Sequence, residues 1–200
     1  MLRFALVTAA AAWLGAPALA PHRPVWTVVL VAITCFFAVQ YSWGVKLSYH
    51  GFQEFFLAAL GWALVLASHG LAAGRVDGVV VVQALIFGLG PLLFGVYSNT
   101  NDVEGDRKVG RPTVAARTSP RGNRRFVRAV SACEFLLILS LPLVGGPWWF
   151  PLALLPTVVL RLKQLRVGFG QGDILRARRI GIDVHRVTVA TLVVVNLVVR

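Results

Sequence analysis

Acidic side chains are scarce in this chain, which has 8 Asp and Glu residues against 20 Lys and Arg among 200. Charge of either sign is limited, because 14% of the residues are charged and 57% are hydrophobic, whereas about a quarter of the residues in a soluble domain are charged. This shortage of charge excludes a soluble globular domain and predicts an integral membrane protein. No water-exposed stretch is long enough to fold by itself, so we expect residues 1–200 to form a single domain.

Cysteine and several catalytic signatures are also rare or missing. The two cysteines, Cys35 and Cys133, lie in apolar segments. We predict that both are small buried side chains, not members of a disulfide framework or a metal site. The sequence contains no HExxH, no G-x-S-x-G and no Walker lysine. These absences argue against a zinc peptidase, a serine hydrolase and a P-loop nucleotide-binding protein.

Long apolar blocks are what the chain does contain, and each approaches the ~20 residues that a helix needs to cross a bilayer. We predict an all-α, polytopic transmembrane helix bundle with about seven spans of this kind. The predicted spans cover residues 1–20, 25–40, 52–73, 79–97, 124–143, 149–160 and 184–200. Residues 1–20 also have the features of a secretory signal, but the later loops alternate between two sides as they would after a first transmembrane helix.

Basic residues produce a net charge of +12. Nearly all Lys and Arg residues, Arg161 among them, lie at the N-terminus or in alternate loops, and the positive-inside rule predicts that these loops face the cytoplasm. The same charges attract anionic headgroups or an anionic substrate. Topology accounts for most of them, so no nucleic-acid partner is expected. Frequent Ala, Val and Arg are compatible with the inner (plasma) membrane of a bacterium.

Three of the few acidic residues gather in one segment, residues 98–117, between two predicted spans. Carboxylates beside a membrane are costly unless something pairs with them. Asp102 and Asp106 are four residues apart, so on a helix both would point from one face. The segment also holds Glu104 and the basic residues Arg107, Lys108 and Arg111. Two carboxylates with basic neighbours suit a divalent cation that carries a polyphosphate, and we predict the functional site here.

Polar residues elsewhere gather in two further loops, 41–52 and 161–183. If the helices form a bundle, these loops converge with the acidic segment over one end, above an apolar cavity. Such a site suits an amphiphile with a long hydrocarbon tail and an anionic head. For loop 41–52 the alternative is an interfacial belt of aromatic and basic anchors. Glu134, inside a predicted span, suits either a functional role or a structural hydrogen bond, and a transporter relay with His69 is disfavoured because no inverted repeat is found.

Three passages resemble the UbiA family of intramembrane prenyltransferases. The family's second aspartate-rich motif, with its trailing Gly-[Arg/Lys]-x-Thr, resembles NDVEGDRKVGRPTVAAR at 101–117. Its tyrosine-and-lysine loop resembles YSWGVKLSYHGFQE at 41–54, and the segment that leads into its last helix resembles ARRIGIDVHR at 177–186. The order and spacing of the passages agree as well, so the chain is identified as a member of that family.

The resemblance implies a nine-helix bundle around a lipid-open chamber, in which Mg²⁺ binds a prenyl diphosphate. At matching positions, Asp102 and Asp106 would be Mg²⁺ ligands, Lys46 and Arg107 would hold the diphosphate, and Tyr41 would line the site. The remaining substrate-binding candidates are Lys108, Arg111, Asn99, Asn101 and His185, the last at the mouth of the final span. An allylic carbocation would form, and an electron-rich, usually aromatic, acceptor carbon would attack it.

Two departures from the family pattern affect the expected metal site. Asn99 stands where many relatives have a third aspartate, which implies weaker metal binding. The family's first aspartate-rich motif has no counterpart, because residues 1–53 contain no Asp or Glu. The seven predicted spans align with the last seven of nine, so we expect a shortened member of the family. A non-catalytic membrane protein that binds a polyprenyl lipid or a partner subunit is the alternative to an enzyme.

Overall fold

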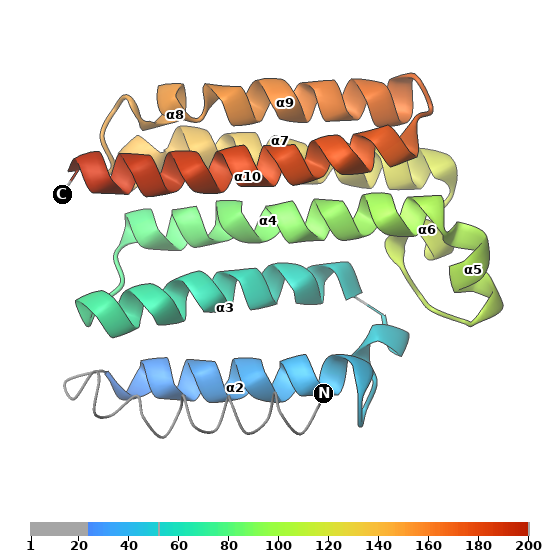
Figure 1. The fold of residues 1–200 in the computed structure, drawn as a ribbon, viewed down its shortest axis with the longest axis horizontal. Coiled ribbons are helices and arrows are strands. Elements are labelled where there is room, and N and C mark those ends of the chain that lie inside the picture. The colour runs from blue at the N-terminus through green and yellow to red at the C-terminus, as the bar shows by residue number, and fades with distance from the viewer. Residues whose placement is uncertain (1–23, 52, 200) are drawn as a thin grey trace.

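Helices run side by side through the computed structural model, which describes residues 24–51 and 53–199 (Figure 1). No strand occurs in these two ranges. The predicted all-helical membrane bundle is therefore confirmed. The α-helices are α2 (Val25–Ser42), α3 (Gln53–Ala73), α4 (Gly78–Asn101), α5 (Val103–Lys108), α6 (Val114–Arg117), α7 (Pro120–Ser140), α8 (Phe150–Ala153), α9 (Leu155–Leu165) and α10 (Ile174–Val199). Short 3₁₀ turns are η1 (Leu47–Tyr49) and η2 (Leu141–Val144), and η3 (Arg166–Gly170) is a π-helical turn.

Four of the described helices are long and apolar enough to cross a membrane, namely α3, α4, α7 continued through η2, and α10. They correspond to the predicted spans at 52–73, 79–97, 124–143 and 184–200. Helix α2 is apolar but shorter. The predicted span at 149–160 is divided into α8 and α9 because Pro151 and Pro156 each occupy a first helical turn, where a proline begins a helix well. The predicted span at 1–20 lies outside the described residues.

Two predicted helix starts are wrong because the residues that cap these helices lie several positions before the apolar blocks. Helix α7 begins at Pro120 and not at 124, since Ser119 Oγ accepts a hydrogen bond from Gly122 N at 3.1 Å. Helix α10 begins at Ile174 and not at 184, with Asp173 Oδ1 accepting from Arg176 N at 2.9 Å. The basic passage 161–183 is therefore mostly helical, although its charge pattern suggested a loop.

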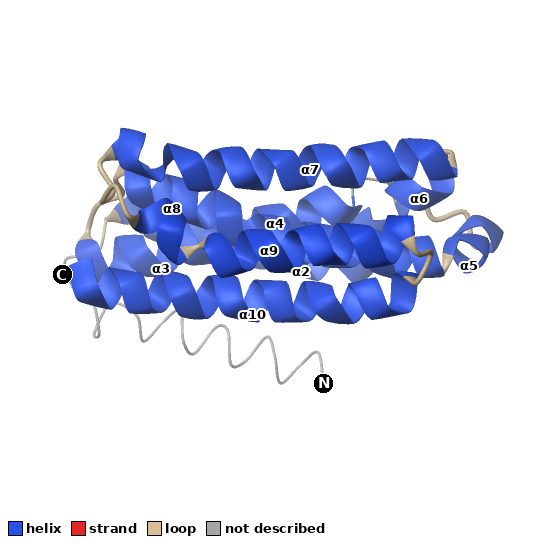
Figure 2. Ribbon diagram, turned by 90° about the horizontal axis from the view of Figure 1, so that it is seen from above, coloured by secondary structure: helices blue, strands red, loops and turns tan. Residues whose placement is uncertain are grey.

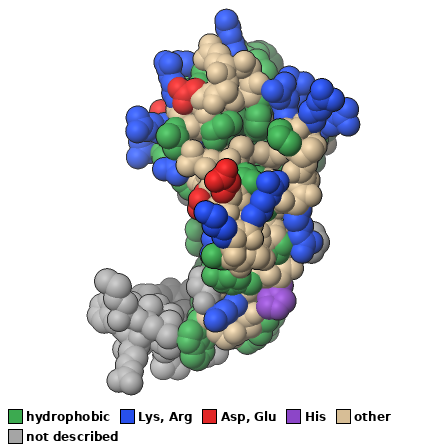
Figure 3. All heavy atoms as spheres, turned by 90° about the vertical axis from the view of Figure 1, so that its right-hand side faces the viewer, with side chains coloured by type: hydrophobic (Ala, Val, Ile, Leu, Met, Phe, Trp, Pro, Cys, Tyr) green, Lys and Arg blue, Asp and Glu red, His purple; other side chains and the backbone are tan. Residues whose placement is uncertain are grey.

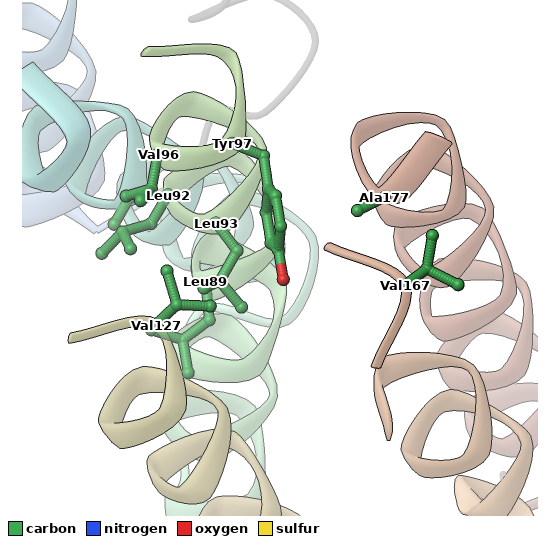
Figure 4. Close-up of a cluster of buried hydrophobic side chains, with 9 residues drawn as sticks. Leu89, Leu92, Leu93, Val96, Tyr97, Val127, Val167 and Ala177 are labelled. Carbon is green, nitrogen blue, oxygen red and sulfur yellow. The ribbon is translucent and has the colours of Figure 1, made fainter. Parts of the chain in front are cut away.

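Helix α4 is the centre of the bundle. It packs against α3 on one side and against α7 and α10 on the other, while α2 covers α3 and α9 covers α10 (Figures 1 and 2). Buried side chains of α4 meet Val127 of α7 and, across from it, Val167 and Ala177 (Figure 4). The α4 side chains of this cluster are Leu89, Leu92, Leu93, Val96 and Tyr97. Contacts with three helices fix where the C-terminal end of α4 lies.

The contact between α3 and α4 depends on a glycine. A Cβ atom at Gly88 would lie 2.7 Å from the carbonyl oxygen of Ala58 and would overlap the indole of Trp62. That indole donates a hydrogen bond from Nε1 to the carbonyl oxygen of Leu85 at 3.2 Å. Small residues allow helix backbones to approach closely in a membrane, and here the approach seats a tryptophan side chain on the α4 backbone.

We expect Gly88→Ala to destabilise the bundle by about 1–3 kcal/mol through overpacking, although alanine favours helix over glycine. The readout is the thermal unfolding midpoint in detergent. Gly95→Ala is the matched control, because its new Cβ would meet only the end of the flexible Leu57 side chain at 3.1 Å and the Glu54 Cγ at 3.6 Å. Equal midpoints for the two variants would show that the close approach at Gly88 contributes no stability.

Polar side chains link α10 to its neighbours at three levels. Gln83 of α4 and Asn196 exchange two amide hydrogen bonds, each of 3.0 Å. The hydroxyls of Thr157 and Thr188 lie 3.1 Å apart between α9 and α10. Gln164 Nε2 donates to the carbonyl oxygen of Ala177 at 3.0 Å. These contacts satisfy buried polar groups and fix the position of α10 along the bundle.

Glu134 and Arg161 form a buried ion pair between α7 and α9. Arg161 donates from Nε to Glu134 Oε2 at 2.7 Å and from Nη2 to Oε1 at 2.9 Å, and both side chains are 1% exposed. Its Nη1 bonds Gln164 Oε1. The assignment of Arg161 to a charged loop is therefore wrong, and of the two roles considered for Glu134 the structure shows the structural one.

Both cysteines differ from their predicted burial. Cys35 and Cys133 are exposed on the described surface, on the outward faces of α2 and α7. The prediction failed because an apolar segment of a membrane helix has lipid-facing positions as well as buried ones, and composition does not separate the two.

Candidate active site

The acidic segment lies at the end of the bundle where α4 finishes, which we call the acidic end (Figure 1). Asp102 stops α4 with φ −117° and ψ 27°, and α5 follows at once. The chain then turns at Gly110, whose φ is +67°. It returns to α6, which Thr113 caps by accepting from Ala116 N at 3.2 Å. The two short helices thus form a hairpin beyond the end of α4.

A polar cleft with a volume of about 770 Å³ lies between this hairpin and the adjoining ends of α4 and α7. Its carboxylates are Asp102 and Glu104, and its cations are Arg107 and Lys108. The other lining residues are Thr100, Asn101, Val103, Gly105, Ala115, Thr118, Pro120 and Asn123. Figure 3, which faces this end, shows a few acidic side chains among many basic ones. The cleft therefore offers oxygen donors and cations side by side.

Asp106 has different surroundings from Asp102. Its side chain is buried, at 3% exposure. Thr113 Oγ1 donates to its Oδ2 at 3.1 Å, and Arg111 Nη1 lies 3.8 Å from its Oδ1. Asp102 is exposed and lines the cleft. Spacing alone suggested one shared helix face, but the helix is interrupted at Asp102, so the two carboxylates are placed in separate environments.

Tyr41 and Arg111 join the group around Asp106. Tyr41 stacks on Phe56 with ring centroids 5.2 Å apart. Burial raises the pKa of its hydroxyl, and the nearby charges of Arg111, Glu54 and Asp106 also act on that pKa. The Arg111 guanidinium also lies over the Tyr49 ring, 5.1 Å from its centroid. Loop 41–52 is therefore in contact with the acidic segment, as its predicted convergence required.

Lys46 and His185 complete the predicted set. Lys46 is exposed, just before η1, with a left-handed φ of 54°. His185 lies within α10, where its ring contacts Phe87 at 4.9 Å between centroids and packs directly on Gly90. His185 therefore lies opposite the middle of α4. It is not at the mouth of the last span, because α10 begins at Ile174.

Two residues that sequence reasoning did not select belong to the same end. Glu54 is fully buried, and its Oε1 accepts from Asn99 Nδ2 at 2.7 Å and from Val114 N at 3.0 Å. Asn123 donates from Nδ2 to Thr100 Oγ1 at 2.7 Å, while its Oδ1 is buried without a protein partner. A carboxylate at the start of a membrane span is a signal that could have identified Glu54.

The donor set at the cleft fits Mg²⁺ that is bound together with phosphate. No three His, Cys, Asp or Glu residues gather into a metal site within 24–51 and 53–199. Mg²⁺, however, commonly takes one or two carboxylates and completes its coordination with water and substrate phosphate. Asp102 and Glu104 offer such carboxylates, Asn123 Oδ1 is an unpartnered oxygen, and Arg107 and Lys108 suit the phosphate charge.

These features define a class, a helical membrane protein with a polar, metal-compatible cleft at one end of its bundle. Within that class, the UbiA prenyltransferase family matches residues 1–173, and the chain belongs to this family. The predicted family is confirmed. Membership implies a prenyltransferase activity in general, with a prenyl diphosphate and an acceptor as substrates within a membrane. No curated protein and no solved structure matches the chain.

Proposed function

We propose that this chain transfers a prenyl group from a prenyl diphosphate to an aromatic acceptor, with Mg²⁺, and that the diphosphate binds in the cleft at the acidic end. The observation that carries this proposal is the composition of the cleft, where Asp102 and Glu104 face the same 770 Å³ space as Arg107 and Lys108. An allylic diphosphate has an anionic head that needs cations and a tail that needs an apolar surface. The apolar helices of the bundle would supply the second.

Each cleft residue has a role that follows from its chemistry. Asp102 would hold Mg²⁺, and Glu104 would support it. Mg²⁺, when bound, offsets the negative charge that grows on the leaving diphosphate. Arg107 and Lys108 bind the diphosphate oxygens. Arg107 is already oriented, since its Nε donates to the carbonyl oxygen of Ala116 at 3.4 Å. As the C–O bond breaks, these cations would stabilise the diphosphate. The acceptor carbon would attack the allylic cation and then lose its proton to water, which restores the aromatic ring.

The group around Asp106 would position the cleft residues. Its carboxylate ties the α5–α6 hairpin together through Thr113 and Arg111. Tyr41, at the end of α2, and Lys46, in the connection that follows, would approach the substrate from the other side of that group. Asn101 extends the cleft lining. In this proposal Asp106 acts on the reaction through the hairpin that it stabilises, and Asp102 is the metal ligand.

Charge supports an orientation with the acidic end in the cytoplasm of a bacterial cell, and residues 1–200 would act there as one domain. Basic residues are dense where α7 and α10 begin, both at the acidic end. Under the positive-inside rule such an end remains on the cytoplasmic side, where a water-soluble head group can reach the cleft.

A second function deserves a test because residues 1–53 contain no Asp or Glu. A chain with one acidic segment could retain the bundle and bind a polyprenyl lipid or another subunit without catalysis. This binding-only role predicts lipid or partner association with no release of diphosphate.

The two functions are separated by one assay. The full chain in liposomes is supplied with geranyl diphosphate and a panel of phenolic acids and quinols, and diphosphate release is measured with Mg²⁺ and with EDTA. We expect release that needs Mg²⁺ and exceeds that of protein-free liposomes. Bound geranyl diphosphate with release no greater than in the protein-free control would favour the binding-only function.

A further inference from the structure

Glu54 joins three separate parts of the acidic end. It lies in the first turn of α3 and is 0% exposed. Its Oε1 accepts one bond from Asn99, near the end of α4, and one from Val114 N, at the start of α6. A buried carboxylate is costly unless donors satisfy it. These two donors compensate its Oε1, while its Oε2 is buried without a protein partner. Removing either would therefore loosen α3, α4 or α6 at this end.

The bond from Asn99 also fixes which side of its amide faces Glu54. The Asn99 amide nitrogen faces the carboxyl group, whose Oε1 accepts its hydrogen bond. The amide oxygen is directed to Gln53 Nε2, at a longer distance of 3.5 Å. Asn99 is itself buried, at 8% exposure, and so both ends of its amide are engaged inside the protein and away from the cleft.

The same bonds reach the cleft through a short chain of contacts. Val114 N, which donates to Glu54, follows Thr113, and the Thr113 hydroxyl donates to Asp106. Asp106 lies in α5 together with Arg107, and α5 begins directly after Asp102. Glu54 thereby holds α6, and α6 holds the hairpin that carries the carboxylate and the cations of the cleft.

We propose that Glu54 and Asn99 form a hydrogen-bonded pair that holds the acidic segment in position. In this proposal Asn99 binds Glu54 and is not a ligand of the metal. The inference rests on the proposed function for the role of the cleft. It also gives a physical reason for Asn99. An aspartate there would place a second carboxylate against a buried one, and like charges at such a distance repel strongly. Asparagine suits this position because its amide nitrogen donates to Glu54.

The test is a cycle of four full-length proteins: the unaltered chain, Asn99→Asp, Glu54→Gln, and the double variant. Each is measured in detergent for its thermal midpoint and for the Mg²⁺ concentration that gives half-maximal binding of geranyl diphosphate. Diphosphate release in liposomes is the third readout. Gln171→Glu is the control for added charge, because this exposed residue lies in the connection between η3 and α10 at the same end.

We expect Asn99→Asp to lower the thermal midpoint and to slow diphosphate release about tenfold or more, equivalent to ~1.4 kcal/mol. Adding Glu54→Gln should restore part of both, because it removes the repulsion and its amide nitrogen can donate to the introduced carboxylate, although the bond from Val114 N to the same Oε1 position is then lost. Glu54→Gln alone should have a smaller effect, since its carbonyl oxygen can accept both native bonds. Gln171→Glu should change neither readout.

Other results would contradict the proposed role of Glu54 and Asn99. If Asn99→Asp lowers the Mg²⁺ concentration for half-maximal binding, whether or not Glu54 is changed, then position 99 faces the metal. If the midpoints of the two single variants simply add in the double variant, the side chains are not coupled. Coupled midpoints with unchanged release would refute the positioning role. Failure of the unaltered chain to bind geranyl diphosphate with Mg²⁺ would instead refute the proposed function and with it the link to the cleft.

Discussion

Asp102→Asn is expected to slow Mg²⁺-dependent prenyl transfer by about a hundredfold or more, since removing one preorganised electrostatic group from an active site costs about that much. Asparagine has the size of aspartate but lacks the charge that holds a divalent cation. The half-maximal Mg²⁺ concentration should rise while the thermal midpoint stays constant, because Asp102 is exposed and its side chain caps no helix. The measurement is diphosphate release across a Mg²⁺ titration.

The matched control for this change is Asp77→Asn. Asp77 caps α4 at the opposite end of the helix, with its Oδ1 accepting from Val80 N at 2.9 Å, and asparagine caps a helix as well as aspartate does. This variant should retain full activity. Asp102→Ala combined with Asp106→Ala provides the strongest test, and a loss of less than about tenfold, or ~1.4 kcal/mol, would contradict the site.

Arg161→Met is expected to cause the largest loss of stability, about 3–5 kcal/mol, since removing one partner of a buried ion pair leaves the other charge uncompensated. The charge left behind is Glu134, which is 1% exposed and receives two bonds from this guanidinium. The measurement is thermal unfolding in detergent. Lys163→Met, at an exposed position two residues along α9, is the control for loss of a positive charge.

A double substitution distinguishes the contribution of the two charges from that of the side-chain volume. Glu134→Leu with Arg161→Met removes both charges and keeps apolar bulk in their place, so most of the lost stability should return, as it does when buried pairs are replaced by hydrophobic residues. If Arg161→Met unfolds no more readily than Lys163→Met, then the pair is not a source of stability and its burial has another origin.

Hydropathy predicted the helices of this bundle well and their ends poorly. The predicted span 52–73 matches α3 at Gln53–Ala73, because an apolar block must be helical to cross lipid. Helix α10, however, begins at Ile174, ten residues before the predicted start of its span. Hydropathy reports where lipid begins, whereas a helix continues until its cap, here at Asp173. The charged residues at 174–183 are therefore predicted as a loop from hydropathy, although they belong to α10.

The location of the candidate site followed from sequence, but its internal arrangement did not. A cluster of carboxylates in a chain with few of them marked residues 98–117. The separation of Asp102 from Asp106 depends on the backbone angles at one residue and on contacts with Thr113 and Arg111. The partners of Glu54 lie 45 and 60 residues away. Pairings at such distances arise only when α3, α4 and α6 meet.

The three polar contacts of α10 also bear on how the bundle is assembled. A slip by one helical turn, about 5.4 Å, would exchange one apolar surface for another at little cost, because lipid tails are as apolar as the side chains. The same slip would break three contacts at once, namely those of Asn196 with Gln83, of Thr188 with Thr157, and of the Ala177 carbonyl oxygen with Gln164. Errors of register thus become costly only after the helices meet. The polar contacts of α10 therefore favour its correct register once the helices pack.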